Sequence, residues 1–262
     1  MKHLLIIFSF LLLFSSIFIS CSKSSDDGSK STDNTTSTDN TTSTDNTTTS
    51  TWTKQLGTTF SDYAFSVTSD SSDNIYVTGY ASRNLDGNTS SGGNDTFLVK
   101  YNSSGTKQWT KQLGTSTNDY GSGVTTDSSG NIYVTGLTVG GLDGNTSSGG
   151  YDIFLVKYNS SGTKQWTKQL GTSSSDSGNG VTIDSSGSIY VTGSTGGGLD
   201  GNTNYGNDCS VPPGFWNSIN NCSDIVLVKY NSSGTKQWTK QLGTSSDDRG
   251  NGVTTDSSGN IY

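Results

Sequence analysis

One six-residue motif, Trp-Thr-Lys-Gln-Leu-Gly, occurs four times in this chain and restricts the possible folds more than any other feature. The copies begin at Trp52, Trp109, Trp166 and Trp238, so they are 57, 57 and 72 residues apart. Self-similarity at a fixed period is typical of architectures in which each unit buries its faces against its neighbours. Residues 52–262 are therefore expected to form stacked copies of a module of about 57 residues.

Each module is expected to be a four-stranded antiparallel meander. In the second module, apolar alternation and turn residues predict strands at 123–126, 131–136, 153–158 and 163–170. Tight turns, each with a glycine suited to positive φ, join the first two strands at 127–130 and the last two at 159–162. In the last strand, alternation places Lys164 on the same side as Trp166.

A four-stranded sheet has two faces to cover, and radial stacking of such sheets is the β-propeller solution. Gly121, Gly123 and Val124 are small, as an innermost strand near a propeller axis requires. Lysines on the last strand suit an outer edge, where they oppose aggregation. The expected fold class is all-β, with propeller-type blades; a β-solenoid or a stacked sandwich is the alternative.

Three segments of the second module resemble a known family. Residues 127–136 (DSSGNIYVTG), 152–159 (DIFLVKYN) and 162–166 (GTKQW) are similar to the bacterial β-propeller repeat named SBBP, after seven-bladed propellers. The resemblance recurs over nearly all of 52–262. It implies the propeller fold and says little about function, because the shared residues occupy turn and core positions.

The N-terminus has the pattern of a secretory signal peptide over residues 1–20. Lys2 and His3 precede an almost unbroken apolar run from 4 to 19, about the length of a signal core and short for a membrane span. Phe18-Ile19-Ser20-Cys21 resembles the lipobox of bacterial lipoproteins. That resemblance implies that Cys21 is lipidated and becomes the mature N-terminus; the alternative is an ordinary signal with an incidental cysteine.

Residues 21–51 follow as a polar stretch of Ser, Thr, Asp, Asn, Lys and Gly after the cysteine, with one hexapeptide in three tandem copies. Such a composition buries too little apolar area to offset the entropy of ordering. We expect a disordered tether that carries the folded modules away from a membrane. The expected location is the bacterial cell envelope, at the outer membrane or cell surface, with the membrane contacted through the lipid.

The charged residues argue against two classes of function. All 22 acidic residues are Asp, and the single histidine, His3, lies in the signal segment. General acid–base catalysis usually draws on His or an environment-tuned carboxyl group, so no catalytic set is expected and the chain is predicted not to be an enzyme. Residues 52–262 carry 12 Lys and Arg against 17 Asp, a net charge of −5, which argues against nucleic-acid partners.

The loop between the second and third strands contains Leu-Asp-Gly-Asn-Thr in each of the three complete modules. Its carboxylates, Asp86, Asp143 and Asp200, are candidate ligand-binding residues. Calcium prefers several oxygen ligands, so Asp86 with Asn88 and Asp95 is an alternative calcium set. A plain polar loop without metal is the favoured reading, and no cofactor is expected.

The third module contains an insertion at 204–223, the least repetitive part of the folded region. Cys209 and Cys222 both lie within it, and in an oxidising envelope they are expected to form a disulfide. Phe215 and Trp216 would then lie at the loop tip. They are candidate ligand contacts, with the alternative that they cover the loop's own small core.

In an up-and-down propeller, the loops between strands two and three share one face with the connections to the next blade. That face is the expected binding surface for a protein or glycan. The alternatives are an exported polysaccharide-active enzyme using Asp pairs, and a non-functional fragment of a longer propeller protein. Residues 260–262 stop inside a strand that continues in every earlier module, so the last repeat is expected to be truncated and the propeller incomplete.

Overall fold

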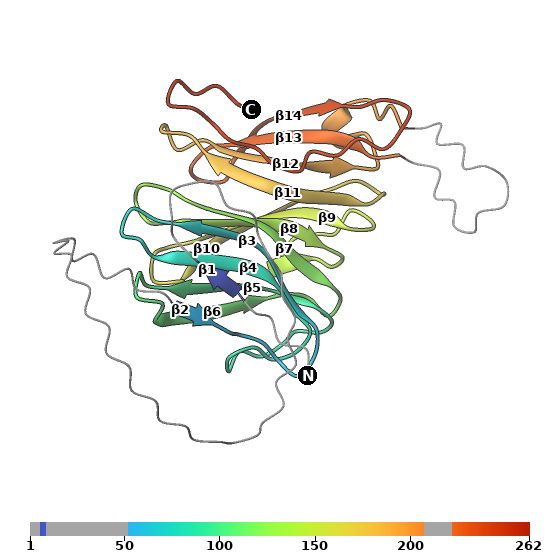
Figure 1. Cartoon of the computed structure of the whole chain (residues 1–262). Coiled ribbons are helices and arrows are strands. Elements are labelled where there is room, and N and C mark those ends of the chain that lie inside the picture. The colour runs from blue at the N-terminus through green and yellow to red at the C-terminus, as the bar shows by residue number, and fades with distance from the viewer. Residues whose placement is uncertain (1–5, 9–51, 207–221) are drawn as a thin grey trace, which may run out of the picture.

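The computed structural model describes residues 6–8, 52–206 and 222–262. Its core consists of three four-stranded antiparallel sheets (Figure 1). The first sheet contains β3 (Asp62–Ser69), β4 (Ile75–Ala81), β5 (Asp95–Tyr101) and β6 (Lys107–Leu113). The second sheet contains β7 (Asp119–Thr126), β8 (Ile132–Thr138), β9 (Asp152–Tyr158) and β10 (Lys164–Leu170). The third sheet contains β11 (Asp176–Ile183), β12 (Ile189–Thr195), β13 (Asp224–Tyr230) and β14 (Lys236–Leu242). Apart from two short 3₁₀ turns, Leu142–Gly144 and Leu199–Gly201, the described residues contain no helix.

Each sheet pairs its strands in chain order, which confirms the predicted meander. The first strand of the second module is longer than predicted, because it begins at Asp119, paired with Thr138. A β-bulge between Gly121 and Gly123 shifts the register there. The alternation of apolar and polar residues, from which the strand was predicted, is interrupted at the bulge, although pairing with β8 continues through it.

A second bulge corrects the predicted orientation of Lys164. Lys164 pairs with Tyr158 whereas Trp166 pairs with Lys157, so the register shifts between them. Neighbouring residues of β9 point to opposite faces, and Lys164 therefore lies on the face opposite Trp166. The prediction that the two share a side was wrong, because an extra residue in the strand reverses the alternation.

The sheets stack through apolar clusters between their faces. One cluster joins the first and second sheets through residues such as Leu98 and Val134. Another joins the second and third through residues such as Leu155 and Val191. The first strands of successive modules are neighbours, because β7 contacts both β3 and β11. This arrangement matches propeller blades whose first strands lie innermost.

The turn between the first two strands is held by its own carboxylate. Asp127 accepts hydrogen bonds from the backbone N–H groups of Ser129 and Asn131, and from the buried Tyr133 hydroxyl at 2.9 Å. Burial raises the pKa of Tyr133, and its bond to the Asp127 carboxylate raises it further. The same contacts recur around Asp70 and Asp184, so the repeated Asp is explained by turn formation.

Three of the four repeated tryptophans contact a glycine of the following module. Gly162 adopts φ +77°, and a Cβ placed on it would lie 3.0 Å from the Trp109 ring. Equivalent contacts join Trp52 to Gly105 and Trp166 to Gly234. The tryptophan of the repeated motif therefore serves module stacking, and the turn glycine that it meets allows both the turn and the ring's close approach.

Two short strands precede the first sheet. β2 (Trp52–Lys54) pairs with β1 (Ile6–Phe8), and Trp52 packs against the first sheet, with its ring centroid 6.1 Å from that of Tyr101. Ile6–Phe8 lies inside the predicted signal peptide. Cys21 and the predicted tether lie outside the described residues. No helix in the described part is long and apolar enough to span a membrane.

The chain continues after β14 into the start of another module. Thr255 pairs with Ile261, and Asp256 accepts hydrogen bonds from Ser258 N and Asn260 N as its counterparts do. Asn179 Nδ2 donates to the Gly250 carbonyl oxygen at 2.9 Å, joining this segment to β11. Residues 244–262 therefore stack on the third sheet as each module stacks on the one before it.

Candidate functional site

The loops that end each sheet on one side form a continuous surface, here called the loop face. It comprises the second-to-third-strand loops, 82–94, 139–151 and the described parts of 196–223, together with the connections between modules at 57–61, 114–118, 171–175 and 243–247. Backbone hydrogen bonds join the two sets, from Gly93 N to Thr117 O and from Gly150 N to Ser174 O. The predicted sharing of one face is therefore what the structure shows.

The loop aspartates predicted to bind ligand are paired inside their own modules. Asp86 has φ +54°; it forms an ion pair with Lys107 and accepts a hydrogen bond from Thr110 Oγ1. Lys164 and Thr167 hold Asp143 in the same way, and Lys236 and Thr239 hold Asp200. Burial would raise the pKa of Asp86, but its bonds to Lys107 and Thr110 leave it lowered. These contacts explain the repeated Asp without a ligand.

The alternative calcium residues make separate contacts. Asn88 Nδ2 donates to the Leu85 and Thr110 carbonyl oxygens, while Asp95 is fully buried and accepts from Ser91 N at 2.7 Å. Among the described residues, no three His, Cys, Asp or Glu side chains gather into a possible metal site. Calcium binding by this set stays the untested alternative to a plain polar loop.

A glutamine of the fourth strand holds each loop in place. Gln112 Nε2 donates to Asp95 Oδ2 and to the Arg83 carbonyl oxygen, and its Oε1 accepts from Leu85 N at 2.9 Å. Gln169 and Gln241 repeat these contacts. Sequence analysis missed this role, although the invariant glutamine of the repeated motif was its signal. The loops are thereby fixed as a frame.

Paired carboxylates lie beneath this frame and are closed to solvent. Asp95 and Asp119 are both 0% exposed. Burial raises the pKa of Asp119, and the nearby Asp95 charge adds to the rise, against the lowering effect of hydrogen bonds from Thr138 and Thr115. Although such a pair resembles acid–base machinery, its burial leaves no access for a polysaccharide substrate.

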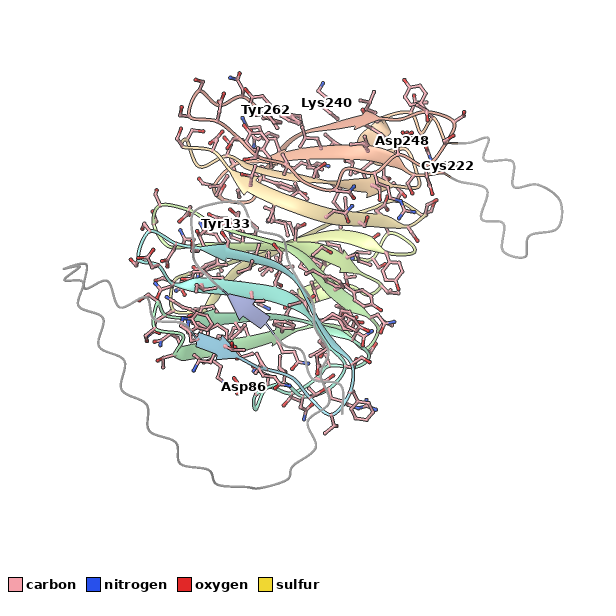
Figure 2. All side chains as sticks on the ribbon, viewed as in Figure 1. Asp86, Tyr133, Cys222, Lys240, Asp248 and Tyr262 are labelled. Carbon is pink, nitrogen blue, oxygen red and sulfur yellow. The ribbon has the colours of Figure 1, made fainter. Side chains whose placement is uncertain are left out.

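The base of the insertion is ordered by backbone bonds. Cys222 N donates to the Gly206 carbonyl oxygen at 3.0 Å, and Asp248 N to Ser223 O at 2.7 Å; Cys222 and Asp248 lie near each other in Figure 2. Cys222 is disulfide-bonded. Cys209, Phe215 and Trp216 lie outside the described residues, so the pairing with Cys209 and the ligand role of the two aromatic residues stay predictions.

The first module departs from the repeat at four positions that lie together. At these positions the first module has Phe60, Phe65, Tyr80 and Arg83. The second module has Thr117, Ser122, Leu137 and Gly140 there, and the third has Ser174, Asn179, Ser194 and Gly197. At the first, second and fourth of these positions, the first module carries a much larger side chain than either counterpart. We call these four residues and Tyr63 the aromatic patch: Phe60 and Arg83 belong to the loop face, and Tyr63, Phe65 and Tyr80 lie on the strand ends that adjoin it.

The aromatic patch is built on the paired ends of β3 and β4. Tyr63 pairs with Tyr80 across the two strands, with ring centroids 5.2 Å apart. Phe65 lies 5.8 Å from Tyr80 and 6.4 Å from Tyr63. Just beyond the strand ends, the Arg83 guanidinium lies over the Phe60 ring at 4.5 Å. Phe60, Tyr63 and Phe65 are 49%, 47% and 56% exposed.

Hydrogen-bonding side chains extend the aromatic patch towards the second module. Tyr80 meets Tyr120 edge to face at 4.9 Å, and Asn94 Nδ2 donates to the Tyr120 hydroxyl at 3.0 Å. Tyr151 follows, 6.3 Å from Tyr120. Tyr120 and Tyr151 correspond to Ser177 and Ser223 in the third module, so the aromatic row ends after the second.

The aromatic patch was not predicted from the sequence, because its residues lie where the modules differ and the prediction rested on what the modules share. The sequence does contain a signal for the patch. When the modules are aligned at their 57-residue spacing, the positions at which the first module differs from the other two become visible. The contacts among them required the structure, because β-bulges in the first strands decide which side chains meet.

A family model described as a beta-propeller repeat, SBBP, matches residues 51–86, 108–143, 165–200 and 237–262, about half of the chain. An uncharacterised WD repeat-containing protein of Acanthamoeba polyphaga mimivirus is 30% identical, over 74% of this chain and 17% of its own length. The regulatory protein FlaEY of Caulobacter vibrioides is 27% identical, over 66% of this chain and 19% of its own. The chain thus spans less than a fifth of the curated relatives it matches.

Proposed function

This chain belongs to the beta-propeller repeat family that carries the SBBP repeat, and on that premise we propose that it is a non-enzymatic interaction module that binds its partner on the loop face. The observation that carries the proposal is the contrast within that face. The repeated side chains are engaged with one another, while three non-repeated residues of the aromatic patch, Phe60, Phe65 and Arg83, are exposed beside the frame they form. Exposed aromatic groups with an arginine are typical of interaction sites.

The relatives support an interaction role in general terms. One is named as a WD repeat-containing protein and the other as a regulatory protein. Neither printed name describes an enzymatic activity. The buried Asp pairs, with their structural hydrogen bonds, also favour binding over catalysis.

We further propose that the module is exported and held at the bacterial envelope by a lipid on Cys21. The support is the apolar run that ends at this cysteine and the polar stretch that follows it. Cys21→Ala should move the protein from the membrane fraction to the soluble fraction. An unmodified Cys21 in the mature protein, seen by mass spectrometry, would remove the anchor while leaving the binding proposal intact.

Blocking each end of one module tests the loop face. Thr146 and Ser128 are both exposed in the second module, Thr146 in a loop of the loop face and Ser128 in the opposite tight turn. A bulky polymer attached through Thr146→Cys should abolish capture of an envelope partner, and the same polymer at Ser128→Cys should leave it unchanged. Loss of capture only with Ser128→Cys would place binding on the turn end.

A further inference from the structure

We propose that the aromatic patch binds an acidic glycan, with sugar rings stacked on its exposed aromatic faces and a uronate carboxylate paired with Arg83. The inference rests on the proposed function, because it names the ligand of the same face. Its basis is the convergence of four non-repeated residues, which turns an otherwise polar, repeated surface into an aromatic and cationic one.

The exposure of Phe60 and Phe65 does not result from the lack of a preceding complete sheet. The second module has a complete sheet on both sides, and there Thr117, the counterpart of Phe60, is still exposed. Ser122, the counterpart of Phe65, is half-buried in the same setting. A side chain at either position therefore reaches the surface even between two neighbours. Val67 differs, because its counterpart Val124 is buried against the preceding sheet.

The size of the patch favours sugar rings over a folded protein partner. An aromatic side chain offers about 150–250 Å², so three half-exposed rings present roughly 200–400 Å². A stable protein interface covers about 800 Å² on each partner. The C–H face of a pyranose ring is apolar and slightly positive, and it complements the negative face of an aromatic ring.

The charge of the patch favours an acidic sugar. Within the described residues, Arg83 forms no ion pair, and its guanidinium rests on Phe60. The nearest acidic side chain along β3, Asp62, instead accepts bonds from Thr58 N and Thr58 Oγ1. An arginine fork matches a carboxylate with two parallel hydrogen bonds, so a uronate is the sugar that satisfies it.

Tyrosine and asparagine groups next to the patch supply the hydrogen bonds that sugar hydroxyls need. Asn94, Tyr120 and Tyr151 lie along the same row. Hydroxyl and carboxamide groups both donate and accept, which suits a ligand rich in hydroxyls. The row also gives the site a direction, from the first module towards the second.

The test is calorimetric titration of the full chain with three six-sugar probes: α-1,4-linked galacturonate, β-1,4-linked mannuronate, and neutral maltohexaose. The expected result is binding of at least one acidic probe, with maltohexaose at least about tenfold weaker. Arg83→Gly, which installs the second module's residue, should lower the acidic affinity about tenfold or more and remove the preference for acidic sugar. Phe60→Thr with Phe65→Ser should weaken all binding.

Two controls keep the result decisive. Arg249→Gly removes the chain's other arginine, which is exposed and lies outside the patch, and should leave affinity unchanged. Thermal unfolding of each variant checks that the fold is retained. Failure of both acidic probes to bind, or equal binding by wild type and Arg83→Gly, would overturn the proposal. If an envelope partner were still captured on the loop face, the proposed function would survive that failure.

Discussion

Asp95 and Asp119, the first residues of β5 and β7, are both fully buried and flank Gly114 at the boundary between the first two modules. A Cβ placed on Gly114 would lie 2.1 Å from Asp95 Oδ1 and 3.0 Å from Asp119 Oδ2. The two carboxylates therefore close a junction that has room only for glycine. Asp152 and Asp176 repeat the pair at the next junction, where burial raises the pKa of Asp176 and the Asp152 charge adds to the rise.

This junction predicts a specific pH dependence. The folded-state pKa of Asp119 is raised above its usual value of 3.8, so its contribution to stability is present below that value and lost as pH rises through the folded pKa. Asp119→Asn removes this loss. In urea unfolding, the free energy of unfolding of the variant minus that of wild type should increase between about pH 4 and about pH 7. The same difference at both pH values, or a smaller one at about pH 7, would contradict this prediction.

The turn carboxylates should act in the opposite direction. Burial would raise the pKa of Asp184, but hydrogen bonds from Ser186, Ser188 and Tyr190 hold it at about 2. Its contribution is therefore present above pH 3.8 and lost as pH falls towards 2. In Asp184→Asn this acid-sensitive part should disappear, so the stability of wild type should fall further than that of the variant between about pH 4 and about pH 2.

Removing one buried hydroxyl tests the same turn without changing a charge. Tyr133 is 1% exposed and donates to Asp127, so Tyr133→Phe should lower the free energy of unfolding by about 1–2 kcal/mol. Tyr262 makes the equivalent bond to Asp256 but is 70% exposed. Tyr262→Phe is the matched control and should cost much less. Equal costs would show that burial does not govern this bond.

Two glycines separate backbone strain from packing between modules. Gly144 and Gly162 both have positive φ, but an added Cβ meets nothing within 4 Å at Gly144, whereas at Gly162 it meets Trp109 and Lys111. Gly144→Ala should cost about 1–2 kcal/mol from its left-handed backbone. Gly162→Ala should cost about 1–3 kcal/mol more. Equal losses in thermal or denaturant unfolding would mean that the tryptophan contact contributes little.

Much of the fold was predictable because each module repeats the same physical pattern. The four-stranded meander follows from alternation and from the turns at Asp127 and Asn159, whose side chains cap their own backbone. Strand orientation was less predictable: the bulge before Trp166 reverses the side on which Lys164 lies, and no residue type marks it. Local alternation describes a strand only while its register is continuous.

The candidate site was less predictable than the fold. Asp86 looked like a ligand from its loop position, whereas its partner Lys107 lies 21 residues away on β6, a contact set by folding. Phe60 and Arg83, 23 positions apart in the sequence, meet only when β3 and β4 pair. Comparing modules for differences would have found these residues but not their contact.

Hydrogen exchange of the full chain, with and without its captured envelope partner, tests the central claim most directly. The account predicts that binding slows exchange in the loops at 82–94 and 139–151 and at the paired ends of β3 and β4 around Tyr63 and Tyr80. Exchange in the tight turns at 70–74 and 127–131 should not change. Protection confined to those turns, with no change on the loop face, would contradict it.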